Sequence, residues 1–124
     1  MKRFKQIASD YKRAYERLKE AADTAKTTLE IDGTIQRFEF TFELSWKLIK
    51  AYLEKEGIIC NSPRKCFKEA YKLGIIENED TWLEMIDDRN LTVHTYDDKT
   101  SRAIFDRIKD HYVIELKKLL ELDG

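Results

Sequence analysis

The sequence of 124 residues contains only one proline and four glycines. With 42% hydrophobic residues, this composition excludes a disordered chain and a glycine-rich binding scaffold. Because turn-forming residues are scarce, the elements are expected to be few and long, which means helices. The length suits a single domain, residues 1–124, that is large enough to bury a hydrophobic core.

The chain also lacks an excess of charge of either sign, with 23 Lys and Arg against 24 Asp and Glu. Nucleic-acid-binding proteins usually carry a basic excess, so any contact with RNA is expected to be local, and DNA is not expected as a partner. No hydrophobic run is long enough for a membrane span, and the first residues are charged rather than apolar like a signal peptide. These absences predict a cytoplasmic protein without a membrane partner.

The two cysteines, Cys60 and Cys66, have no histidine or further cysteine at metal-binding spacing. We therefore predict that they are reduced thiols acting as small hydrophobic residues. No other cluster of histidines or carboxylates has the spacing of a metal site, and a glycine-rich phosphate loop is also missing. The sequence thus predicts neither a metal nor a cofactor.

The first predicted element is a long amphipathic helix over residues 4–29. Its apolar residues fall on one stripe at the helical period of 100° per residue. We expect Ile31-Asp32-Gly33 to end this helix, with Gly33 as the breaker.

The next segment, residues 38–48, alternates apolar and polar residues and is therefore ambiguous between a strand and a helix. As a helix it has two apolar arcs and a narrow polar strip, on which Glu43 and Lys47 stand at salt-bridge spacing. The pattern continues without a turn signal to Gly57, and no other segment provides a strand to pair with it. These facts favour a helix that is buried on two sides, either within its bundle or against a partner.

Three further helices complete the predicted fold. Ser62 and Pro63 form a good helix start, and this short helix is expected to end at Gly74 after turning Cys66, Phe67, Ala70 and Tyr71 inward. Asn78 is a plausible N-cap for a helix over residues 79–93, and the last helix is expected from Asp97 or Asp98 to about Leu122. Short connections between such helices predict an all-α, antiparallel up-and-down bundle of four to five helices.

Reactive side chains are concentrated in one stretch, residues 89–96. On the preceding helix Arg89 shares a face with apolar residues, and burying an unpaired charge is costly. Arg89 must therefore meet a carboxylate, line a cleft or face another subunit. On a continuous helix Arg89 and His94 would lie about 140° apart, too far to grip one ligand. They can converge if the helix ends between them, or if each subunit of a dimer contributes one of them.

This set of residues is suited to phosphodiester chemistry. Arg89 can bind a phosphate through two parallel hydrogen bonds and stabilise the charge that develops on its oxygens. His94 can exchange a proton with a ribose hydroxyl or a leaving oxygen, and Asn90 can orient a substrate group. A lone histidine is more often structural, and His111, at the edge of the last helix's apolar stripe, fits that description.

Two motifs resemble one known superfamily. The pattern Arg89-Asn90-x3-His94-x-Tyr96 matches the Arg-x4-His-x-Tyr signature of HEPN domains. The segment from Gln36 to Lys47 resembles the second-helix signature of one branch, the nucleotidyltransferase substrate-binding-protein-like family. The resemblance covers essentially the whole chain and implies a helical bundle that forms a homodimer.

The resemblance also implies a partner, a minimal nucleotidyltransferase (MNT), because related HEPN–MNT pairs behave as toxin and antitoxin. In them the HEPN subunit is a metal-independent RNase whose arginine and histidine meet across the dimer, and the MNT silences it by adenylylating the motif tyrosine. Carried over to this sequence, Arg89 and His94 would be catalytic, Asn90 supporting and Tyr96 the modification site.

Three hypotheses therefore remain open at the level of the sequence. The chain is an endoribonuclease toxin controlled by an MNT partner, a non-catalytic subunit that presents substrate to a nucleotidyltransferase, or a helical dimerisation module whose motif is structural. A fold or motif alone does not decide between them.

Overall fold

A computed structural model describes residues 2–93 and 97–123 of the protein, and these ranges are helical apart from short connections. The long N-terminal helices are α1 (Lys2–Thr24) and α2 (Thr28–Lys55), and the short ones are α3 (Pro63–Lys72) and α4 (Glu79–Leu91). The C-terminal part runs on without a break through α5 (Asp98–Arg107), a π-helical turn (Ile108–Tyr112), α6 (Val113–Lys118) and a final 3₁₀ turn (Leu119–Glu121). The predicted all-α class, with three long and two short helical bodies, is confirmed.

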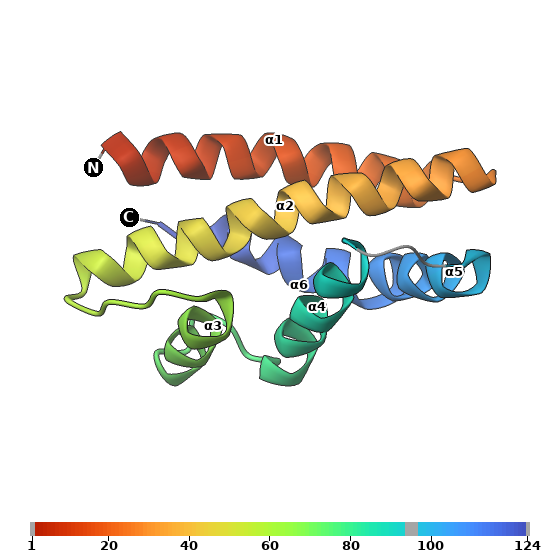
Figure 1. The fold of residues 1–124 in the computed structure, drawn as a ribbon. Helices are drawn as coiled ribbons and strands as arrows, with labels where there is room; N and C mark the ends of the chain where they lie inside the picture. Colours follow the sequence, from red (N-terminus) through yellow and green to blue (C-terminus); the bar gives the residue numbers. More distant parts are fainter. Residues whose placement is uncertain (1, 94–96, 124) are drawn as a thin grey trace.

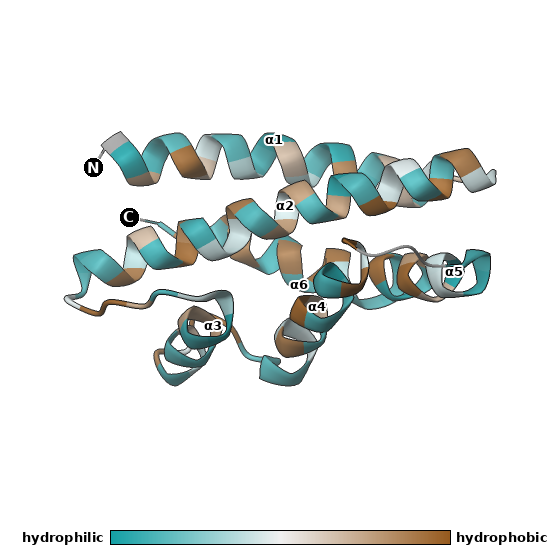
Figure 2. Cartoon of the chain, viewed as in Figure 1, coloured by the Kyte–Doolittle hydropathy of each residue, from teal (hydrophilic) through white to brown (hydrophobic). Residues whose placement is uncertain are grey.

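The three long helical bodies, α1, α2 and the body from α5 to α6, run roughly parallel to a common axis. In the view of Figure 1, α3 and α4 lie below α2. Hydrophobic and hydrophilic residues alternate around each helix, as expected for helices that each bury one face (Figure 2). The Tyr11 hydroxyl donates to the Leu116 carbonyl at 2.6 Å, which joins α1 to α6. None of the helices in the described ranges is long and apolar enough to span a membrane.

The first turn between helices lies earlier than the sequence predicted. The chain turns at residues 25–27, where Thr27 and Glu30 form a capping box in which each side chain accepts from the other's backbone N–H. Gly33, the predicted breaker, lies inside α2 and has no positive φ. The prediction was wrong because two cap hydrogen bonds fix the start of α2, whereas a glycine in a helix costs only about 1 kcal/mol.

The ambiguous segment is confirmed as a helix, the central part of α2. Aromatic rings from four helical bodies pack against one another through the core. The Tyr112 ring of the C-terminal body stacks on Phe38 of α2, with ring centroids 5.4 Å apart. Phe67 of α3 meets Phe42 of α2 edge-on at 5.9 Å and packs on Trp82 of α4 at 5.0 Å. Such pairs contribute beyond the area they bury. They hold α4, through Trp82, at a fixed place along α2.

The helix α3 begins as predicted, since Ser62 caps it by accepting from the Lys65 backbone N–H and Pro63 is its first residue. Its end is also confirmed, because Gly74 adopts a φ of 76° that favours glycine. Cys66, Phe67 and Ala70 are buried as expected. Tyr71 was predicted to face inward but is exposed.

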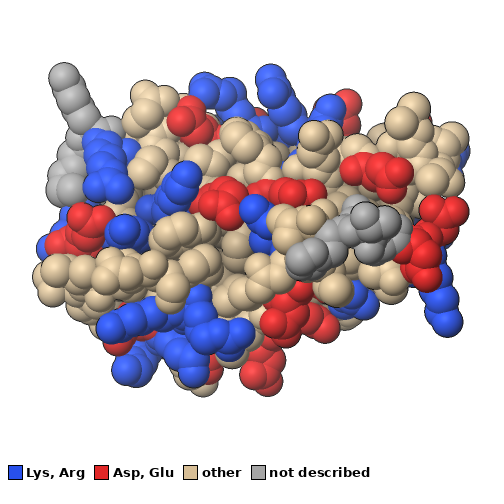
Figure 3. Space-filling view, in the orientation of Figure 1, with Lys and Arg blue, Asp and Glu red and all other residues tan. Residues whose placement is uncertain are grey.

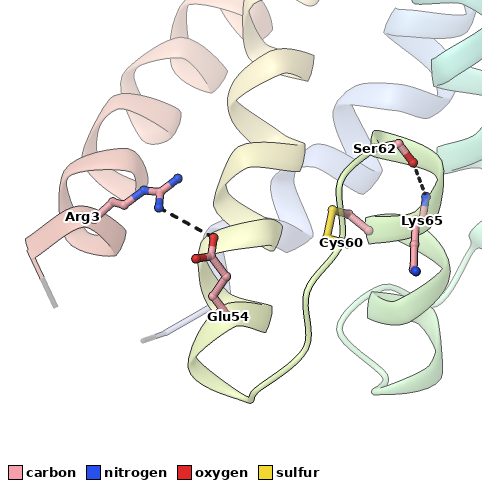
Figure 4. Close-up of a disulfide and its surroundings, with 6 residues drawn as sticks. Arg3, Glu54, Cys60, Ser62 and Lys65 are labelled. Atoms are coloured by element: carbon pink, nitrogen blue, oxygen red, sulfur yellow. Dashed lines mark hydrogen bonds and ion pairs between the residues drawn. A yellow bond between two sulfur atoms is a disulfide. The ribbon is translucent and has the colours of Figure 1, made fainter.

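The prediction of two reduced thiols was wrong, because Cys60 and Cys66 form a disulfide. Figure 4 shows this bond beside the start of α3. The chain after α2 folds back along α3 and brings the two Cα atoms to 5.2 Å, within the range of a disulfide. Sequence spacing alone could not reveal this return.

Removing this disulfide is expected to lower the free energy of unfolding by about 2 kcal/mol, the value for a short loop whose closure no longer restricts the unfolded chain. Urea unfolding with and without a reducing agent measures the change. The double variant Cys60→Ala/Cys66→Ala serves as the control, because its stability must not depend on the reductant. Equal stability of the wild type under both conditions would contradict the prediction.

Candidate functional site

The candidate site lies at the C-terminal end of α4. The helix ends at Leu91, where the Thr92 N–H donates to the Asp88 carbonyl and the Thr92 hydroxyl donates to the Arg89 carbonyl at 2.7 Å. The predicted helix end between Arg89 and His94 is therefore confirmed. His94 and Tyr96 themselves lie outside the described residues, so their predicted roles stay predictions.

Arg89 points from α4 to α2, where its Nη2 lies 3.6 Å from the Glu43 carboxylate. Of the three alternatives for this cation, the carboxylate partner is present. The pair is partly accessible, since 24% of the Arg89 side chain and 37% of the Glu43 side chain are exposed. The Arg89 Nε is buried and has no hydrogen-bond partner among the described residues.

Glu43 is held in place by its neighbour on α2, because the Trp46 Nε1–H donates to the Glu43 Oε2 at 3.2 Å. The ion pair of Glu43 in the described part of the chain is with Arg89, not with Lys47 as its helical spacing suggested. A partly exposed pair of this kind adds little stability. Its effect is to fix the direction of the Arg89 guanidinium.

Asn90 was predicted to support catalysis. The structure places it next to Arg89 at the end of α4, with its side chain exposed to solvent. Its side chain forms no hydrogen bond within residues 2–93 and 97–123, so these residues do not hold it against Arg89.

The sequence reasoning missed a buried charged cluster directly beside Arg89. Asp88 is buried, and Arg107 of α5 donates to both of its carboxylate oxygens, at 2.7 and 2.8 Å. The buried Tyr112 hydroxyl donates to the same carboxylate. We call Asp88, Arg107 and Tyr112 the Asp88 cluster. It joins α4 to the C-terminal helix one residue before the motif arginine.

The Tyr112 hydroxyl and the Arg107 guanidinium keep their protons near neutral pH. Burial, and then the hydrogen bond to Asp88, raise the pKa of Tyr112 well above its usual value. The hydrogen bonds to Asp88 likewise raise the pKa of Arg107. The cluster therefore supports the site as a fixed structure and not as a proton donor.

The surface charge around α4 is divided. Acidic side chains gather over α4 and basic ones over α3 (Figure 3). The acidic side chains of α4 that are at least partly exposed are Glu79, Asp80, Glu84 and Asp87. Within the described ranges no group of three or more His, Cys, Asp or Glu side chains is arranged to hold a metal ion.

Residues 6–122 match the family model described as nucleotidyltransferase substrate binding protein like. The chain belongs to this family. Its recognition as a branch of the HEPN superfamily, drawn from the two motifs, is thereby confirmed. The match begins within α1 and extends past the C-terminal 3₁₀ turn, so it spans nearly the whole bundle.

The chain is also similar to individual known proteins. The "Probable ribonuclease HepT" of Haemophilus influenzae is 36% identical over 96 residues, which are 73% of this chain and 65% of that protein. This chain thus spans slightly less than two thirds of that relative.

Two solved structures are also similar. A Thermus thermophilus protein has a TM-score of 0.83 at 41% identity, covering 89% of this chain and 95% of its own. A Haemophilus influenzae protein, described as having the fold of a substrate binding domain of a nucleotidyltransferase, has a TM-score of 0.79 at 29% identity, covering 92% and 96%.

Proposed function

We propose that the protein is the HEPN subunit of a two-component toxin–antitoxin system and that, as a homodimer, it is a metal-independent endoribonuclease. The observation that carries the proposal is the placement of Arg89: a partly exposed guanidinium at the end of α4, oriented by one carboxylate at 3.6 Å. The regular helix that would set the motif histidine about 140° away from Arg89 ends at Leu91. The relative named probable ribonuclease HepT supports the same function.

In the proposed reaction a ribose 2′-oxygen attacks the neighbouring phosphorus and the bond to the 5′-oxygen of the next nucleotide breaks. Arg89 holds the phosphate and stabilises the charge that develops on its oxygens. His94 of the other protomer exchanges a proton with the 2′-hydroxyl or the leaving oxygen. Asn90, exposed beside Arg89, orients the substrate. The products are a 2′,3′-cyclic phosphate and a 5′-hydroxyl.

The proposed partner is a minimal nucleotidyltransferase that neutralises the protein by adenylylating Tyr96. A phenol in the same motif as the catalytic pair is well placed for such control, because a bulky, charged adduct there would obstruct an RNA strand. Intact-mass analysis after incubation with the partner and ATP tests this role. An adenylyl adduct that is absent, or that persists in Tyr96→Phe, would exclude Tyr96 as the modification site.

A second candidate function is a non-catalytic subunit that presents substrate to the nucleotidyltransferase. The family description and the Haemophilus influenzae structure described as a substrate binding domain favour it. The Glu43 carboxylate beside Arg89 is also compatible with a site that binds but does not cleave.

Incubating the purified protein with end-labelled RNA in the presence of EDTA separates the two candidates. We expect fragments that end in a 2′,3′-cyclic phosphate, and we expect His94→Ala to abolish them. The matched control is His111→Ala, which replaces the other histidine. Because His111 is exposed on the C-terminal helix, this variant should cleave RNA at the wild-type rate. Intact RNA with the wild type, or equal cleavage by His94→Ala, would refute the endoribonuclease.

A further inference from the structure

A groove of about 480 Å³ runs between α1 and α2. Arg13 and Arg17 line it from α1, and Gln36, Arg37 and Phe40 line it from α2. The two helices are tied together at this place, because the Thr41 hydroxyl donates to the Ala14 carbonyl at 3.3 Å. The groove is thus part of a rigid helix pair and not of a loop.

Phe40 is the unusual residue of the groove. It is 61% exposed, although its neighbours Phe38 and Phe42 on the same helix are buried. A phenylalanine exposed to water on a rigid helix presents a flat apolar face at a small conformational cost, because only its two side-chain torsions become fixed on binding. Such a face suits a stacked planar ring, and nucleobases stack on aromatic side chains regardless of sequence.

The arginines give the groove a positive charge. Its lining holds three arginines and one acid, Asp10, which pairs with Arg13 at 2.6 Å. Arg37 is fixed across the groove, since its Nη1 donates to the Arg17 carbonyl at 3.0 Å. In a chain with a net charge of −1, this is a local concentration of the cation that best matches phosphate geometry.

The groove lies on the same side of α2 as the candidate site. Gln36, Phe40 and Glu43 fall within about 60° around the helix, and Phe40 and Glu43 are only about 4.5 Å apart along its axis. Glu43 is the residue that contacts Arg89. Figure 3 shows acidic side chains over both α4 and the middle of α2, so the cations that attract a phosphate chain here are Arg89 and the arginines of the groove.

We propose that this groove binds an unpaired nucleotide of a single-stranded RNA, with the base on Phe40 and the adjoining phosphates at the arginines. This inference rests on the proposed function and assigns the substrate class: single-stranded rather than base-paired RNA. A second copy of the chain is the less favourable occupant, because a two-fold contact would bring the same positive groove against itself. A protein interface would also have an apolar centre of several side chains, not one ring among arginines.

The test uses a fluorescein-labelled single-stranded 2′-O-methyl RNA, which cannot be cleaved through its 2′-oxygen, and fluorescence anisotropy. Phe40→Ala is expected to weaken binding about tenfold, the usual effect of removing one stacking ring, whereas Phe40→Tyr retains affinity within about twofold. A duplex of the same sequence is expected to bind more weakly than the single strand because its bases are not free to stack.

The phosphate contact is tested by salt dependence. Arg17→Gln is expected to reduce the slope of log affinity against log salt by about 0.7, the value for one phosphate contact with a single strand. A purely structural role of Arg17 would not change this slope. The matched controls are Ile59→Ala, which removes an exposed apolar side chain after α2, and Lys68→Gln, which removes one exposed charge from α3. Both should bind like the wild type.

The outcomes separate this inference from the proposed function. RNA cleavage together with unchanged binding by Phe40→Ala would refute the groove and leave the endoribonuclease intact. Weakened binding without any cleavage by the wild type would support the groove and refute the endoribonuclease. A wild type that does not bind the probe, an equal loss in Lys68→Gln, or a change in oligomeric state of Phe40→Ala by light scattering would each overturn the groove as an RNA site.

Discussion

Replacing Arg89 by lysine is expected to reduce RNA cleavage about a hundredfold, and replacing it by alanine about a thousandfold, the range for losing a preorganised donor to a developing oxyanion. Lysine keeps the charge but has no planar fork to hold two phosphate oxygens at once, so this change is not conservative. Rates of cleavage under single-turnover conditions measure the effect. Binding of the uncleavable RNA should fall much less than the rate.

The loss must be distinguished from a loss of structure. Arg89→Ala leaves Glu43 without its partner, but the Glu43 side chain is 37% exposed and can be hydrated, so the melting temperature should change little. Arg102→Ala is the matched control, because Arg102 is an exposed arginine whose ion pair in the described part of the chain is with Asp106 on its own helix. Cleavage by Arg89→Lys at the wild-type rate would show that Arg89 is not the phosphate-binding group.

Replacing Asp88 by alanine is expected to lower the free energy of unfolding by about 3 kcal/mol, because breaking a buried ion pair leaves its partners uncompensated. Arg107 loses both of its hydrogen bonds, and the buried Tyr112 hydroxyl loses its acceptor. The value lies at the lower end of the range for buried pairs because 31% of the Arg107 side chain is exposed and can regain water. Urea unfolding followed by circular dichroism measures it.

A surface pair provides the comparison. Asp106→Ala breaks the exposed pair with Arg102, at 3.3 Å on the same helix, and should cost about 0.5 kcal/mol or less. Asp88→Asn should fall between the two, because the amide oxygen keeps one acceptor for the cluster. If Asp88→Ala proves as stable as Asp106→Ala, the Asp88 cluster does not stabilise the attachment of α4.

The helices were predictable where a local pattern determines them. The period of α2, the Ser62 cap of α3 and the Asp97 start of α5 can all be read from neighbouring residues, and the structure has them at these places. The start of α2 was misplaced because Gly33 was taken as the helix breaker. The start is set instead by Thr27 and Glu30, whose side chains accept from two backbone N–H groups. Two hydrogen bonds outweigh one weak helix former.

The candidate site was predictable in its residues but not in its surroundings. Arg89 stands out in the sequence because a charge interrupts an apolar stripe, and the structure supplies the carboxylate that such a charge requires. That Glu43 is this carboxylate depends on how α4 crosses α2, which no local pattern gives. No local pattern marks Asp88 as buried, and only its distant partners Arg107 and Tyr112 reveal its role.

The prediction of two reduced thiols was wrong for the same reason. A spacing of six residues between Cys60 and Cys66 is compatible with many conformations, and only the return of the chain onto α3 brings them together. The exposure of Phe40 was hidden as well, because the apolar period of α2 marks it as an interior position.

The π-helical turn at Ile108–Tyr112 has a geometric consequence for the Asp88 cluster. Arg107 and Tyr112 are five positions apart, and on a regular α-helix such residues diverge by about 140°. In a π-helix the hydrogen bonds join residues five apart, which brings the two side chains to the same side and to one carboxylate. The π-helical turn therefore lets one carboxylate accept from residues 19 and 24 positions farther along the chain. The irregular turn and the attachment of α4 to the C-terminal helix thus depend on the same three side chains.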